Sequence, residues 1–227
     1  MPTRSLLCRL AVVGAIACTP LTARAQGPSV LDFEGFNGLP SQGCGGNSIA
    51  SYGGLSWSSI GWASRTQCGQ ADPPDGPFNG YHFGTTSGAR AGYLQLATRA
   101  TPFAAVSGTI SSGAHHFNLL DGWLTAAWSR RLRVVVTGYR GPTVVGTQTL
   151  LLDYTQPTFV RFALLDLTSV RFDADGGTPD WALGGIGNQL VMDDLRIEDA
   201  SVVPEPATLL LVAPGLVAVA LVRRRRR

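Results

Sequence analysis

Residues 132–150 read LRVVVTGYRGPTVVGTQTL, two runs rich in valine, threonine and leucine on either side of a Gly-Pro pair. Such residues favour β-strands, whereas glycine and proline favour the tight turn that joins two strands. We therefore predict strands over residues 131–139 and 144–152, with a turn at 139–143 between them.

Similar short runs recur along most of the chain. They predict further strands over residues 30–33, 55–58, 93–96, 105–110, 123–128, 158–164, 167–172 and 190–198. A helix over 117–132 is the alternative for one region, because apolar residues recur there at helical spacing. Gly122 interrupts that helical pattern, so strands are favoured. Many short strands with Gly-rich turns predict an all-β fold, a two-sheet antiparallel β-sandwich that is jelly-roll-like.

The first 25 residues have the order of a secretory signal peptide. Arg4 and Arg9 precede or flank an apolar run at 10–17, and Ala23-Arg24-Ala25 supplies small residues for cleavage after Ala25. The alternative is a lipoprotein signal, in which Cys18 would take the lipid.

The chain closes with VPEPATLLLVAPGLVAVALVRRRRR, residues 203–227. The sixteen residues 207–222 carry no charge and would span ~24 Å as a helix, somewhat less than the ~30 Å hydrocarbon core of a bilayer. The terminal arginines (Arg223, Arg224, Arg225, Arg226 and Arg227) can stay at the cytoplasmic face while their stems cover the missing length. A transmembrane helix is therefore predicted, and a buried core helix with a basic tag is the alternative.

A signal peptide, a globular middle, the triplet Pro204-Glu205-Pro206, an apolar span and an arginine cluster together resemble the PEP-CTERM sorting arrangement of Gram-negative bacteria. The resemblance implies export, transient anchoring of the precursor in the inner membrane, and processing near the triplet by an exosortase-type transpeptidase. It also implies a final place at the cell surface or in the extracellular matrix, in association with exopolysaccharide.

The body of the chain carries a second resemblance. The segments FNLLDGWLTAAW, LRVVVTGYRGPTVVGTQTL, TFVRF, LTSVRF and LVMDDLRI, between residues 117 and 197, are similar in order to galactose-binding-like and carbohydrate-binding jelly rolls. The expected organisation is a signal peptide at 1–25, a β-sandwich domain at 26–201, and a sorting segment at 202–227.

Charge excludes one class of partner. The whole chain has a formal charge of +3, but residues 26–202 hold ten arginines against fourteen acidic residues. The excess of positive charge therefore belongs to the terminal segments. A mildly acidic domain with scattered arginines has no electrostatic footprint for nucleic acid.

Two cysteines, Cys44 and Cys68, remain once the signal peptide is removed. An even pair in an oxidising compartment predicts a disulfide, which would stabilise the domain by roughly 3 kcal/mol. Residues 40–92 are dense in glycine, serine, asparagine and proline, and we expect them to form a loop excursion held by this disulfide.

Two groups of side chains are candidates for ligand binding. Trp57, Trp62 and Tyr81 lie in the Gly-rich region, where exposed rings could stack on sugars, or could instead plug the loop onto the core. Asp32 and Glu34 follow the first strand, and Asp193 and Asp194 lie in the last. If these strands meet, the four carboxylates could hold a structural calcium ion; alternatively, Asp194 bonds a neighbouring loop and the others face water.

No catalytic motif stands out. Gly54–Ser58, for example, lacks the final glycine of a nucleophile elbow. We therefore expect no catalytic residues and no cofactor other than calcium, in an exported, non-catalytic surface or matrix protein that binds exopolysaccharide. The alternative is a polysaccharide-processing enzyme of the glycoside hydrolase type that uses surface carboxylates.

Overall fold

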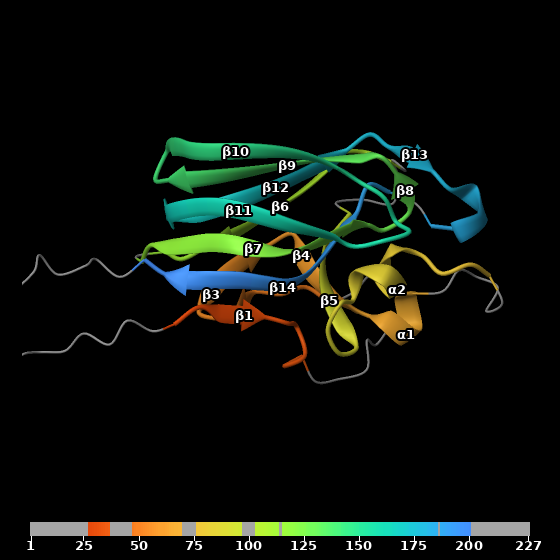
Figure 1. Ribbon diagram of the computed structural model, residues 1–227, viewed down its shortest axis with the longest axis horizontal. Helices are drawn as coiled ribbons and strands as arrows, with labels where there is room; N and C mark the ends of the chain where they lie inside the picture. The colour runs from red at the N-terminus through yellow and green to blue at the C-terminus, as the bar shows by residue number, and fades with distance from the viewer. Residues whose placement is uncertain are drawn as a thin grey trace, which may run out of the picture.

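The computed structural model describes residues 27–36, 47–69, 76–96, 103–113, 115–185 and 187–200. Within these residues the chain forms two six-stranded antiparallel sheets and a short two-stranded ribbon (Figure 1). The predicted all-β, antiparallel fold is confirmed. The signal peptide at 1–25, Cys44 and the sorting segment, with its predicted transmembrane helix, lie outside the described residues.

The first sheet, called sheet A, has β14 near its centre. Its strands run in the order β11 (Thr158–Leu167), β7 (Phe117–Ala126), β14 (Leu190–Asp199), β5 (Arg90–Leu94) and β4 (Ile60–Ser64), and β1 (Ser29–Leu31) also pairs with β14. β1 lies opposite Leu195–Ile197, whereas β5 lies opposite Val191 and Met192, so the two strands use different stretches of β14. The first and last strands therefore meet, which was the condition for the candidate calcium site.

The second sheet, called sheet B, contains the hairpin from which the fold was predicted. Its order is β10 (Thr143–Leu152), β9 (Leu132–Arg140), β12 (Ser169–Asp175), β6 (Val106–Ser111), β3 (Leu55–Ser58) and β2 (Ser51–Tyr52). Arg140 pairs with Thr143 across a two-residue turn, and the φ angle of Gly141 is +56°. Glycine adopts a positive φ without steric cost, which explains the tight connection.

The core lies between the two sheets. In β9 the alternate residues Leu132, Val134 and Val136 are fully buried, as the strand period of two requires. Leu119 and Leu124 of β7 belong to the same buried cluster. The predicted helical alternative for residues 117–132 is wrong, because extended pairing of β7 with both β11 and β14 overrides the local spacing.

The region expected to be a loop excursion contains regular structure in its described part. β2 and β3 are strands of sheet B, and β4 is a strand of sheet A. The short helices α1 (Arg65–Cys68) and α2 (Gly80–Gly84) follow. The Asn79 side chain accepts a bond from the Tyr81 amide and donates to the Cys68 carbonyl, which ties the two helices together. Glycine-rich sequence here permits close packing instead of an extended loop.

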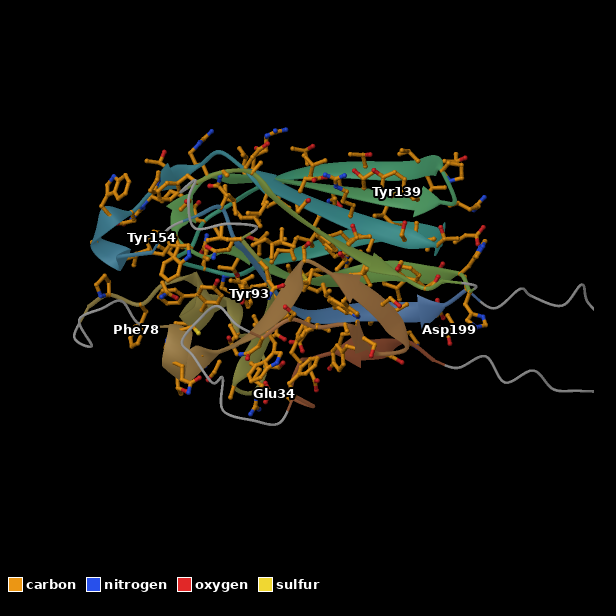
Figure 2. All side chains as sticks on the ribbon, turned by 180° about the vertical axis from the view of Figure 1, so that it is seen from behind. Glu34, Phe78, Tyr93, Tyr139, Tyr154 and Asp199 are labelled. Atoms are coloured by element: carbon orange, nitrogen blue, oxygen red, sulfur yellow. The ribbon has the colours of Figure 1, made fainter. Side chains whose placement is uncertain are left out.

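A Cβ atom on Gly80 would lie 1.7 Å from the main-chain oxygen of Ala126, so only glycine allows α2 this close to β7. The remaining elements are β8 (Ser129–Arg130), β13 (Thr178–Pro179) and the 3₁₀ turn η2 (Trp181–Leu183). Figure 2 shows Phe78 and Tyr154 toward one end of the molecule and Tyr139 and Asp199 toward the other.

In the described part of the chain, no helix has the length and apolar character needed to cross a membrane.

Candidate functional site

The aromatic residues predicted to contact sugars are part of the core. Trp57 is 5% exposed, Trp62 8% and Tyr81 1%. Trp57 points inward from β3 and its indole N–H donates to the Tyr52 carbonyl, while Trp62 stacks on Phe36 at 5.9 Å. These rings therefore cannot offer a face to a sugar, and the prediction is corrected: they plug this region onto the core.

The carboxylates of the last strand hold a loop in place. Asp193 is fully buried, and its Oδ2 accepts bonds from the amides of Thr86 and Ser87 at 2.7 and 2.9 Å. Burial raises the pKa of Asp193 to about 7. Asp194 accepts a bond from the Thr86 hydroxyl at 3.1 Å, so it binds the neighbouring loop as the alternative proposed.

The carboxylates after the first strand also bind protein donors. Glu34 accepts from the amides of Ala89 and Arg90 at 2.8 and 2.7 Å, and Asp32 accepts from the Tyr52 hydroxyl at 3.0 Å. Among the described residues, no group of three or more His, Cys, Asp or Glu side chains could hold a metal ion. The four carboxylates do not fit the predicted calcium site. Glu34, Asp193 and Asp194 hold residues 86–90 in place instead, and Asp32 bonds to Tyr52 and to the Glu34 amide.

An open pocket of about 550 Å³ lies on sheet A, over β7, β11 and β14. Its lining combines apolar and charged side chains: Leu120, Asp121, Phe159, Arg161, Ala163, Leu165 and Arg196. Phe159 and Leu165 are 45% and 55% exposed, so two large apolar side chains face solvent here. A concave apolar site with a few polar groups is the usual form of a ligand pocket.

Three charged residues on neighbouring strands lie opposite one another across this surface, and we call them the ionic row. Arg161 of β11 lies opposite Asp121 of β7, and Asp121 lies opposite Arg196 of β14. Arg196 donates to the Asp121 carboxylate, which is nearly buried. Arg161, in contrast, forms no ion pair with any described residue, so its guanidinium remains available.

An aromatic pair lies beside the ionic row. Phe159 is opposite Trp123 in the register, and their ring centroids are 5.2 Å apart. Phe159 and Arg161 are two residues apart on one strand, so both project from the same face of the sheet. The pocket thus presents a ring and a planar cation side by side.

Irregular pairing shapes the floor of the pocket. The register of β11 against β7 shifts between Arg161 and Leu164, where Ala163 has a φ angle of +48°. The register of β14 against β7 shifts between Arg196 and Ile197, and both Leu120 and Asp121 line the pocket. Bulges of this kind bend a strand and redirect side chains, and they are frequent beside binding sites.

The pocket residues did not emerge from the sequence. In β11 the exposed Phe159, Ala163 and Leu165 alternate with the buried Val160, Phe162 and Leu164. Both faces of the strand are therefore apolar, which is typical of a strand covered on both sides. One feature of the sequence could have indicated an exposed face, namely the single arginine, Arg161, within this apolar run.

A scan of the sequence against protein-family models gives no match, and a search of curated proteins finds no similar sequence. Among solved structures, the chain is similar to TmCBM61 in complex with β-1,4-galactotriose, with 10% identity and a TM-score of 0.31 over 66% of this chain and 91% of that one. A second solved structure, described as "CBM4 structure and function", has 16% identity and a TM-score of 0.27, and the match covers 48% of this chain and 70% of that one.

The enzymatically active domain of tailspike protein 4 from bacteriophage CBA120 is also similar, with 8% identity and a TM-score of 0.31. That similarity covers 64% of this chain and 19% of the tailspike chain. At these identities and TM-scores the similarities carry no argument about what this chain does.

Proposed function

We propose that this chain is an exported, non-catalytic protein of the cell surface or extracellular matrix, and that its pocket on sheet A binds polysaccharide. The observation that carries the proposal is the pairing of the exposed Phe159 ring with the available Arg161 guanidinium in one open pocket.

The chemistry of a sugar ring suits this arrangement. One face of the ring carries C–H groups that pack on an aromatic side chain, and its edge carries hydroxyl groups that accept hydrogen bonds. Phe159 supplies the aromatic face and is held by Trp123 at 5.2 Å, so little side-chain freedom is lost on binding. Arg161 supplies several N–H donors in a planar fork.

The same pocket does not support glycoside hydrolysis. The usual mechanism needs two carboxyl groups on either side of the scissile bond, one as acid and the other as base or nucleophile. The pocket lining contains a single carboxylate, Asp121, which Arg196 already binds. Binding without cleavage is therefore the function that these residues support.

Export and sorting complete the proposal. The signal peptide would carry the domain across the inner membrane, the apolar span would halt it, and the arginine cluster would keep the C-terminus in the cytoplasm. Processing at Pro204–Pro206 by an exosortase-type transpeptidase would then release the domain to the surface or matrix. This part rests on the sequence motifs alone.

The binding test uses the full-length chain in detergent and polysaccharide extracted from the producing cells. Phe159→Ala should weaken binding at least about fivefold, because stacking on an aromatic ring contributes on the order of 1 kcal/mol beyond buried area. Trp181→Ala is the matched control, since Trp181 is 74% exposed but does not line the pocket.

Equal affinity of Phe159→Ala and the unchanged chain would overturn the binding site. Incubation of the chain with the same polysaccharide tests the non-catalytic role separately. A steady appearance of new reducing ends would show hydrolysis and overturn that part of the proposal.

A further inference from the structure

We propose that the pocket selects acidic polysaccharide, with the carboxylate of a uronic acid bound by Arg161. This inference rests on the proposed polysaccharide binding and names the class of sugar. It follows from how charge is distributed along the ionic row and over the rest of the domain.

Most arginines of the described domain already have an acidic partner. Ion pairs join Arg90, Arg130, Arg133, Arg140, Arg171 and Arg196 to aspartate or glutamate side chains. Arg65, Arg131 and Arg161 have no such ion pair with a described residue. Of these three, only Arg161 lines the pocket.

The pocket therefore carries net positive charge on a domain that is acidic. Its lining holds two arginines and one aspartate, and Arg196 neutralises that aspartate. Residues 26–202 hold fourteen acids against ten arginines, so the domain as a whole repels an anionic chain. Charge complementarity thus limits an acidic ligand to the few places where a cation is available.

The surroundings of Arg161 favour a carboxylate over a hydroxyl group. The apolar side chains of Phe159, Ala163 and Leu165 line the same pocket, and they lower the local dielectric once a ligand excludes water. A guanidinium is weakly hydrated and presents two parallel N–H groups that match the two oxygens of a carboxylate. A uronate ring stacked on Phe159 could place its carboxylate against this fork, two residues along the strand.

The experiment compares one polyuronate with its carboxyl-reduced form, which keeps the same linkages and ring shapes but has no charge. The full-length chain in detergent should bind the polyuronate about tenfold more tightly, and this preference should shrink as salt rises. Arg161→Gln should lose the preference and still bind the reduced form. Arg131→Gln, which changes an arginine outside the pocket, should keep it.

The outcomes separate the two proposals. Equal binding of the polyuronate and its reduced form overturns the uronate assignment and leaves polysaccharide binding intact. Binding of neither form, with extracted polysaccharide also unbound, overturns the proposed function itself. A preference that persists in Arg161→Gln removes Arg161 from the site. A polysaccharide of neutral sugars that carries sulfate groups instead of carboxylates serves as a further probe. If it binds as well as the polyuronate, the site recognises anions in general and the assignment to a carboxylate is overturned.

Folding of the variants is checked by the β-sheet circular dichroism signal. Arg161→Lys provides a second variant that retains the charge and removes the planar fork. It should retain part of the preference for the polyuronate, whereas full retention would overturn the bidentate contact with a carboxylate.

Discussion

Asp193 should make the stability of the domain depend on pH in a direction opposite to most carboxylates. Its side chain is fully buried in β14, and burial raises its pKa from 3.8 to about 7. The amides of Thr86 and Ser87 oppose this shift because they favour the ionised form. Burial is the larger effect, so Asp193 is expected to keep its proton in the folded state at pH values below about 7.

The magnitude follows from the two pKa values. Between pH 3.8 and about 7 the folded state keeps a proton on Asp193 that the unfolded state releases. Stability therefore falls as the pH rises through this window, and the contribution is constant on either side of it. At ~1.4 kcal/mol for each pH unit, the loss from pH 4 to pH 8 is about 4 kcal/mol.

The assay is urea unfolding of the full-length chain and of Asp193→Asn, followed by tryptophan fluorescence from pH 4 to pH 8. Asparagine cannot ionise, so the cost of its altered hydrogen bonds to residues 86 and 87 should not change with pH. The unchanged chain should lose about 4 kcal/mol relative to Asp193→Asn as the pH rises across this range. A difference that stays constant would refute the reasoning and show that the backbone donors keep Asp193 ionised.

Three further outcomes are expected. Gly80→Ala should cost about 2 kcal/mol in thermal or urea unfolding, because its Cβ would meet main-chain atoms of β7, whereas Gly35→Ala, with open space around it, should be neutral. Non-reducing peptide mapping of exported protein should find Cys44 bonded to Cys68; alkylation of both thiols without reduction would contradict this. Replacing Arg223–Arg227 with serine should impair retention of the precursor in the inner membrane, measured by cell fractionation, and unchanged retention would count against the topology.

Local signals were sufficient to predict the hairpin of sheet B. The turn at Gly141-Pro142 and the β-branched runs on either side act over a few residues, and the structure pairs Arg140 with Thr143 as these signals require. The meeting of the first and last strands entered the sequence analysis only as the condition for a calcium site. Ser29 pairs with Ile197, a contact that no local pattern specifies.

Burial of the aromatic residues could not be predicted from their neighbours in sequence. Trp62 and Tyr81 lie among glycines and polar residues that are typical of loops, yet β4 pairs with β5 and α2 packs against β7. Those contacts join segments far apart along the chain. The rings of Phe159 and Trp123 were missed for the opposite reason, because their strands have the apolar composition of a core and the sheet leaves their outer face open.

The proposed binding surface on sheet A reaches close to the end of the domain where the described chain begins and ends. Ser29 and Ile197 lie side by side, so the described domain begins and ends at the same end of the sandwich (Figure 1). The ionic row runs across the strands of sheet A, and its register continues from Arg196 to the exposed Val30 of β1. At ~4.8 Å between neighbouring strands, the row from Arg161 to Val30 spans roughly 14 Å, which is longer than one sugar ring. If the pocket binds polysaccharide as proposed, a sugar chain that follows the row would extend across the face of sheet A, near the end of the domain that precedes the proposed sorting segment.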